Sequence, residues 1–189
     1  MDGSWSVFGF IRMLEHLKES YERVEGFESI FAPAQAGWFT DQPRFKWQYH
    51  QQELKAIRDF VLAAPRDFEK VFPVLRTLTG PLAIKAIQIA SPGWIEIVGG
   101  LSALKVLASV INAYRSENTK RQDIKSKLLR DLVELVPEET RKKYSPTIMW
   151  IAESMVDPTF NGIETILVDQ KITHASIVES EEQDVEDEL

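Results

Sequence analysis

Apolar residues recur every three or four positions between residues 5 and 24, and charged residues fill most of the places between them. This spacing predicts an amphipathic helix. Ser4 is placed to cap its N terminus and Gly26 to end it. Residues 27–40 then predict a loop or a short helix with exposed aromatic side chains.

A β-hairpin is predicted between residues 82 and 98. The segments LAIKAIQIA (82–90) and WIEIV (94–98) are rich in isoleucine with single polar interruptions, which is typical of strands with a buried face. Pro92-Gly93 between them suits a type II turn. Because such turns match the strand twist poorly, a bulge or a slightly open hairpin is expected. Gly99-Gly100 then ends the second strand.

Helical spacing returns in four further stretches, residues 41–64, 65–80, 101–136 and 137–157. The apolar stripe lapses between Ser116 and Asp123, so residues 101–136 predict either one long helix or two helices that meet at a bend. Ser145-Pro146 is suited to start the last helix, and Asp157-Pro158 to end it.

A second hairpin is predicted near the C terminus, over residues 163–178. IETILV (163–168) and KITHASIV (171–178) are strand-like and are separated by Asp169-Gln170. Two hairpins distant in sequence can form one antiparallel sheet that helices cover on one face. The sequence therefore predicts a helix-rich α+β fold in a single domain, residues 1–178, with a small sheet built from the hairpins at about 82–98 and 163–178.

Residues 179–189 form an acidic tail with seven acidic and no basic residues. Since the whole chain has a formal net charge of −7, residues 1–178 are formally neutral. The tail has no apolar period and is expected to be disordered.

The chain contains no cysteine, which excludes disulfides, zinc–thiolate sites and a cysteine nucleophile. Hydrophobic residues make up 44% of the sequence, enough for a substantial core. We find no targeting segment and no transmembrane segment, because charged residues interrupt each apolar run. A cytoplasmic location is therefore expected.

Two arrangements raise the question of a metal or phosphate site. His16-x-x-Glu19 and His50-x-x-Glu53 each place an imidazole and a carboxylate on one face of a predicted helix, but the order is the reverse of that in carboxylate-bridged bundles. The segment after Val98 lacks the spacing of a phosphate-binding glycine loop. We therefore expect neither a metal nor a cofactor.

Residues 44–50 (RFKWQYH) alternate polar or basic residues with aromatic ones. This alternation has strand periodicity, and basic groups beside aromatic rings also occur in binders of single-stranded nucleic acid. The apolar stripe that continues through Leu54 and Ile57 favours the first turns of a helix instead. The possible contacts here are, for a partner protein, Trp38, Phe39 and Trp47, and for a polyanion, Arg44, Lys46 and His50.

Basic residues are also dense between positions 115 and 143, but acidic residues accompany them and the net charge is only weakly positive. A nucleic-acid-binding domain usually has a stronger excess of positive charge. The candidates for polyanion contact in this stretch are Arg115, Lys120, Arg121, Lys125, Lys127, Arg141, Lys142 and Lys143.

The sequence favours a non-enzymatic module, of bacterial or phage type, that binds another protein. It has an adequate core, aromatic residues in or beside a predicted loop, and an acidic tail suited to partner contact. The alternative is a weak nucleic-acid binder whose basic helical segment is modulated by the tail. An enzyme with a non-local active site is a second alternative, although no GxSxG or comparable motif places a nucleophile beside a base.

Overall fold

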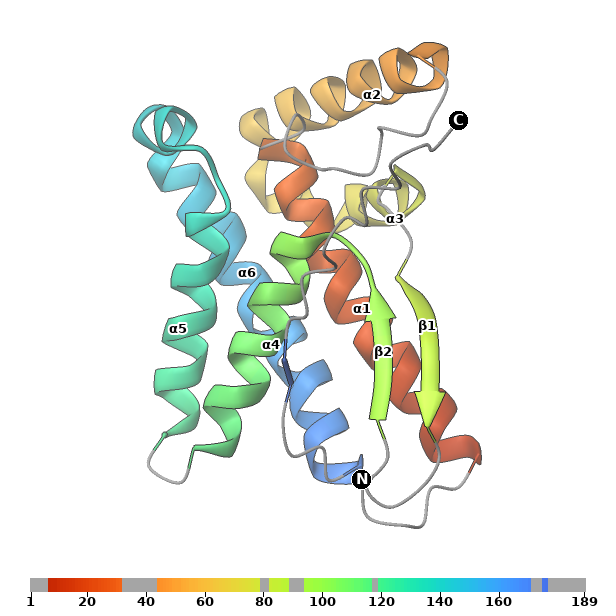
Figure 1. Ribbon diagram of the computed structural model, residues 1–189. Helices are drawn as coiled ribbons and strands as arrows, with labels where there is room; N and C mark the ends of the chain where they lie inside the picture. The colour runs from red at the N-terminus through yellow and green to blue at the C-terminus, as the bar shows by residue number, and fades with distance from the viewer. Residues whose placement is uncertain are drawn as a thin grey trace, which may run out of the picture.

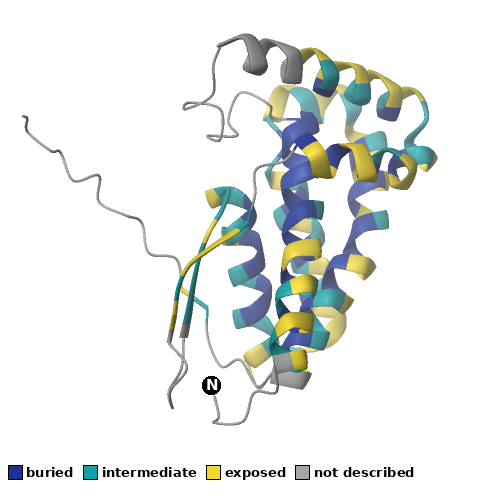
Figure 2. Ribbon diagram, turned by 90° about the vertical axis from the view of Figure 1, so that its right-hand side faces the viewer, coloured by how far each residue is buried: buried dark blue, intermediate teal, exposed yellow. Residues whose placement is uncertain are grey.

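The computed structural model is a bundle of α-helices with one β-hairpin on its outside (Figure 1). It describes residues 7–31, 44–78, 82–88, 94–116, 119–170 and 175–176. Buried residues lie on the helix faces that point toward one another, whereas the described residues of the hairpin are only partly buried or exposed (Figure 2).

Helix α1 (Val7–Phe31) is the centre of the bundle. Phe27, Ile30 and Phe31 are buried at its C-terminal end, so the expected helix end at Gly26 and the exposed position expected for Phe31 are wrong. Packing on several sides outweighs the ~1 kcal/mol that a glycine costs within a helix. The helices that contact α1 are α2 (Arg44–Ala63), α3 (Phe68–Leu78), α4 (Leu101–Arg115), α5 (Arg121–Glu134) and α6 (Glu138–Gln170).

Helices α1 and α6 approach each other closely where small residues meet. A Cβ atom added at Gly162 would lie 2.6 Å from Ser20 Oγ. The Ser20 hydroxyl donates a hydrogen bond of 3.5 Å to the Thr159 carbonyl oxygen. Because neither residue holds the helices apart, the large side chains on either side interlock to form the core.

Helix α6 corrects the expectation of a second hairpin. Residues 163–168 belong to this helix, which continues through Pro158 to Gln170. Ile163, Ile166 and Leu167 are each 1% exposed, and this i, i+3, i+4 spacing places them on one helical face. The β-branched residues suggested a strand, but burial of this face decides in favour of the helix. Tyr144, at φ −125° and ψ 24°, kinks α6 just before Pro146, near the expected helix start.

The first hairpin is confirmed as β1 (Ala83–Gln88) paired with β2 (Trp94–Val98) in antiparallel orientation. The expected irregularity occurs as a shift of register between Ile84 and Ala86. In Figure 1 the hairpin lies in front of α1, and the chain passes from β2 almost directly into α4.

Residues 101–136 form two helices, α4 and α5, that pack against each other, so the bend is the correct alternative. Residues 44–50 are helical and begin α2, which excludes the strand alternative for them. A short 3-10 helix (Pro65–Asp67) precedes α3, and Pro73 lies inside α3.

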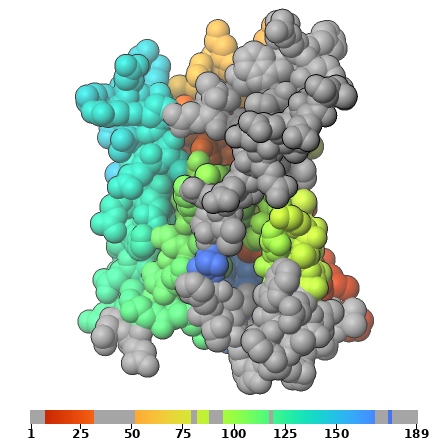
Figure 3. Space-filling model, viewed as in Figure 1, coloured from red at the N-terminus to blue at the C-terminus, as the bar shows by residue number. Residues whose placement is uncertain are grey.

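Ala175 and Ser176 lie against α4, between that helix and the hairpin on the face seen in Figure 3. The Asn112 side chain donates a 2.8 Å hydrogen bond to the Ala175 carbonyl, and its oxygen accepts a 3.0 Å bond from the Ala175 amide. These two residues are in no strand, and the other residues of the expected segment 171–178 lie outside the described residues, as do the Pro92-Gly93 turn and the acidic tail 179–189.

Among the described helices, none is long and apolar enough to cross a lipid bilayer.

The helical state of residues 163–168 can be tested by alanine substitution. Ile166→Ala and Leu167→Ala should each lower the free energy of unfolding by about 2–5 kcal/mol, because both side chains are buried. Val168→Ala should change it by less than about 0.5 kcal/mol, since Val168 is 61% exposed. Urea unfolding of the three variants measures this. A strand would bury alternate residues, so a large loss at only one of positions 166 and 167 would contradict the helix.

Candidate functional site

The junction between β2 and α4 is held against α1 by Tyr21. This side chain is fully buried, and its hydroxyl oxygen accepts a 2.7 Å hydrogen bond from the Gly100 amide. A Cβ atom at Gly99 would lie 2.8 Å from the Tyr21 ring. The two glycines therefore end the strand and also let the backbone come close to α1.

Two buried carboxyl groups continue from Tyr21 along the same face of α1. Glu25 is 1% exposed and Glu28 is 4% exposed. The Tyr21 hydroxyl is hydrogen-bonded to Glu25, and the Ser102 hydroxyl in the first turn of α4 is hydrogen-bonded to Glu28. Glu25 Oε2 has no hydrogen-bond partner among the described residues. We call Tyr21, Glu25, Glu28 and the 99–102 segment the junction cluster.

The electrostatics of the junction cluster follow from its burial. Loss of solvation, followed by repulsion from Glu28, raises the pKa of Glu25 to about 7, and the bond with Tyr21 partly opposes this. Burial likewise raises the pKa of Glu28, and the Ser102 hydroxyl opposes it. Burial and the nearby Glu25 raise the pKa of the Tyr21 hydroxyl.

Glu22, one turn before this cluster, differs because it has cationic partners. Glu22 Oε2 lies 2.7 Å from Arg76 Nε on α3 and forms an ion pair with it. The same carboxylate forms a second ion pair with Lys18 on α1. The acidic face of α1 is therefore neutralised at Glu22, while Glu25 and Glu28 stand beside each other beneath α4.

The chemistry of the junction cluster is that of a buried proton-binding group. Two carboxyls with perturbed pKa values can divide acid and base roles in an active site. None of these groups lines the shallow groove of about 300 Å³ between α5 and α6. The described contacts of the cluster are those with the junction between β2 and α4.

The sequence pattern missed this cluster because a helix ending at Gly26 has no position for Glu28. The signal was present, since Tyr21, Glu25 and Glu28 follow the i, i+4, i+7 spacing of one helical face. The spacing does not show which element covers this face. The structure shows that the first turn of α4 covers it.

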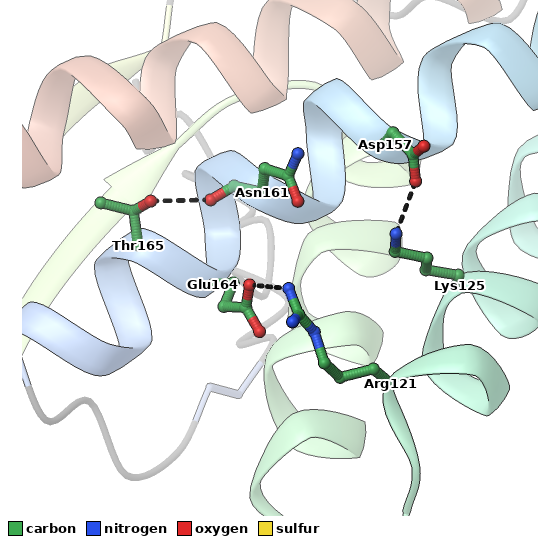
Figure 4. Close-up of polar contacts among 6 residues, drawn as sticks. All are labelled: Arg121, Lys125, Asp157, Asn161, Glu164 and Thr165. Atoms are coloured by element: carbon green, nitrogen blue, oxygen red, sulfur yellow. Dashed lines mark hydrogen bonds and ion pairs between the residues drawn. The ribbon is translucent and has the colours of Figure 1, made fainter.

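The basic residues singled out on α5 are brought to α6, where acidic residues meet them (Figure 4). Lys125 Nζ lies 2.6 Å from Asp157 Oδ1, and Arg121 forms an ion pair with Glu164. Both cations also lie over the Phe160 ring, at 5.3 Å for Lys125 and 5.5 Å for Arg121. These contacts fix α5 on α6 and neutralise both charges.

Most of the other bases in this stretch also have local partners. Arg115 donates a 2.7 Å hydrogen bond to the Leu167 carbonyl. Lys127 pairs with Asp131 at 3.1 Å, and Lys142 with Glu138 at 2.7 Å. Lys143 lies over the Tyr144 ring, Arg141 is partly buried, and Lys120 is exposed just before α5. The structure places these bases on a surface of mixed charge.

A shallow groove of about 300 Å³ runs between α5 and α6 on this surface. Its lining includes Lys125 together with Glu153 and Asp157, so it does not have the uniform positive charge that suits a polyanion. The remaining lining residues are Gln122, Ser126, Leu129 and Val156.

The other predicted contacts are only partly described. Trp38 and Phe39 lie outside the described residues. Arg44, Lys46, Trp47 and His50 are on the first turns of α2, but their side chains lie outside the description. Within the described part of the chain, no group of three or more histidine and acidic side chains is arranged to hold a metal ion.

The close contact at Gly99 predicts a specific sensitivity. Gly99→Ala should lower the free energy of unfolding by about 1–3 kcal/mol, because the new methyl group meets the buried Tyr21 ring. The matched control is Gly100→Ala, whose φ of −54° and ψ of 121° any residue can adopt. Thermal and urea unfolding measure both variants. Equal stability of the two would show that β2 is not seated on Tyr21.

The Tyr21 hydroxyl is tested by Tyr21→Phe, which keeps the ring. Removal of the hydroxyl leaves the Gly100 amide without its acceptor and Glu25 without its hydrogen bond. The free energy of unfolding should fall by about 1–3 kcal/mol. Urea unfolding at pH 6 provides the measurement, and an unchanged stability would contradict the role given to this hydrogen bond.

Comparison with known proteins adds no identification. No protein-family model, no curated protein and no solved structure matches the chain.

Proposed function

We propose that the chain is a protein-binding module whose contact surface is the apolar face of the β1–β2 hairpin. Cross-strand pairing places Ile84 opposite Ile97 and Ile87 opposite Ile95, so the four isoleucines share one face. Ile95 and Ile97 pack against the core, whereas Ile84 and Ile87 are 42% and 40% exposed. This uncovered apolar strip on β1 is the observation that supports the proposal.

The mode of contact follows from the edge of β1. An exposed strand edge can accept a further strand, and proteins discourage this with lysine residues and bulges. Strand β1 carries both, because Lys85 lies at the shift of register and pairs with Glu96 at 2.8 Å. The partner is therefore expected to cover the face of the hairpin and not to extend its sheet.

Exposed apolar residues also lie beyond β1. Val98 at the end of β2 is 45% exposed, and Leu101 at the start of α4 is 46% exposed. Because successive residues of a strand point to opposite faces, Val98 lies on the face opposite Ile95 and Ile97, whereas Leu101 lies beyond the two-glycine junction at the start of α4. The Lys85–Glu96 ion pair also lies on that opposite face, because Glu96 stands between Ile95 and Ile97 in β2.

The acidic tail supports a partner with basic groups beside its apolar surface. Asn112 holds Ala175 between α4 and the hairpin, and the tail begins three residues after Ser176 (Figure 3). Three residues span at most about 10 Å, which is the greatest separation that the chain allows between Ser176 and the first acidic residue. Charge attraction of this kind raises the rate of association.

The nucleic-acid alternative has weaker support. Arg121, Lys125, Lys127 and Lys142 have acidic partners within the chain, so a phosphate would have to compete with those carboxylates. The protein-binding proposal does not require any of these ion pairs to break.

The proposal is tested with the double variant Ile84→Thr/Ile87→Thr, since threonine keeps the strand preference of a β-branched residue while removing apolar area. The control is Phe60→Gln on α2, because Phe60 is exposed to a similar extent, 45%. Tagged wild type and both variants are incubated with native lysate, with and without nuclease, and bound proteins are quantified by mass spectrometry. Circular dichroism verifies that each variant is folded.

We expect one protein to be recovered in stoichiometric amounts by wild type and the Phe60 variant, and at least about tenfold less by the hairpin variant. Recovery that is equal for both variants would contradict the hairpin surface. Recovery that nuclease abolishes would favour the nucleic-acid alternative.

A further inference from the structure

Among the described residues, the hairpin meets the bundle through apolar contacts of β2 and through the junction cluster. Ile95 and Ile97 pack against the helices, and the Gly100 amide binds the Tyr21 hydroxyl at 2.7 Å. Gly99-Gly100 follows at once, with no side chains to stiffen the connection. A change in the cluster therefore acts directly on the position of the hairpin.

The groups that face Glu25 come from three helices. On α1 they are the Tyr21 hydroxyl and the Glu28 carboxyl, and one turn away Glu22, which is neutralised by Arg76 of α3. At the N terminus of α4 they are the Gly100 amide, which contacts Tyr21, and Ser102, which contacts Glu28. Lys105 follows one turn later with its side chain exposed. Loss of solvation, followed by repulsion from Glu28, raises the pKa of Glu25.

The α4 side of the cluster can stabilise one negative charge. Ser102 donates to Glu28, and a helix N terminus favours an anion beside it. A second charge would lie on Glu25, whose Oε2 atom has no hydrogen-bond partner among the described residues. Ionised Glu25 is best relieved when water reaches it, which requires the first turn of α4 to move away from α1.

We propose that the Gly99-Gly100 junction is a pH-responsive hinge, in which ionisation of Glu25 beside Glu28 loosens the first turn of α4 and the attached hairpin from α1. The seated form of the hinge favours the protonated form of Glu25. The open form exposes Glu25 to water and holds it ionised. This regulatory role goes beyond the proposed binding function and does not depend on the partner.

The direction of the pH effect follows from linkage. In the seated form the pKa of Glu25 is about 7, and in the open form it returns toward its ordinary value of 4.5. Below about pH 4.5 both forms are protonated, so pH has no effect on the hinge. Between these values the open form gains about tenfold in population for each pH unit, and above about pH 7 the gain levels off at roughly 10²- to 10³-fold.

Hydrogen exchange of the backbone amides measures this opening. Exchange of the Gly100 and Leu104 amides, which donate to the Tyr21 hydroxyl and to the Gly100 carbonyl, is followed by mass spectrometry between pH 5 and 8.5, and each rate is divided by the intrinsic chemical rate at that pH. We expect protection of these amides to fall as pH rises and to level off near pH 7. Amides of α5 around Leu128, which is buried on another helix, serve as the internal reference and should keep constant protection.

Three variants make the experiment specific. Glu25→Gln should remove the pH dependence at the junction and raise protection above that of wild type at pH 8. Glu28→Gln removes the repelling charge and should move the levelling point to lower pH. Glu15→Gln, an exposed position on the same helix, should behave as wild type.

A pH profile of Glu25→Gln that matches wild type would overturn the hinge. A loss of protection that extends equally to α5 would also overturn it, since this would report global unfolding. If Glu25→Gln does not fold, the shift expected for Glu28→Gln still decides the question.

Discussion

The burial of α1 on several sides is the constraint from which most of this structure follows. Five other helices contact α1, so polar groups on its inner faces cost free energy wherever they lack partners. Ser20 meets this requirement through Thr159 of α6, Glu22 through Arg76 of α3, and Tyr21 through the Gly100 amide. The polar residues of α1 thus connect the core to α3, α6 and the hairpin junction.

Charged side chains at the surface of this molecule and acidic side chains in its interior differ in how strongly they interact. Ion pairs such as Arg121–Glu164 and Lys125–Asp157 lie at the α5–α6 surface, where water already solvates each charge, so they contribute at most about 1 kcal/mol each. Their stacking over Phe160 defines how the helices sit. Glu25 and Glu28 lie in the interior, where charges are poorly solvated. Repulsion between two carboxylates is therefore much stronger there than at the surface.

The hairpin depends on the helices because two strands alone are only marginally stable in water. Strand β2 obtains support from the core through Ile95 and Ile97, and from Tyr21 through Gly100. Strand β1 has only β2 as a strand partner among the described residues, so its isoleucines stay partly exposed. The same arrangement that makes the hairpin an attractive binding surface leaves its position dependent on a small junction.

The sequence by itself determined the local elements. Isoleucine-rich segments joined through Pro92-Gly93 indicated the β1–β2 hairpin, Gly99-Gly100 indicated its end, and the lapse in the apolar stripe after Ser116 allowed for two helices. These signals lie within a few residues of one another, and local backbone preference and apolar spacing are sufficient to interpret them.

Only the tertiary structure decided those features that depend on contacts between residues far apart in the sequence. Residues 163–168 have strand-like composition, yet they are helical because α1 and its neighbours bury one face of α6. Helix α1 continues past Gly26 for the same reason. Arg121 pairs with Glu164, which is 43 residues away in the sequence, and the Tyr21 hydroxyl binds the amide of Gly100, which is 79 residues away. Such pairings depend on how helices pack in three dimensions, and helical spacing shows which residues face inward without showing what they face.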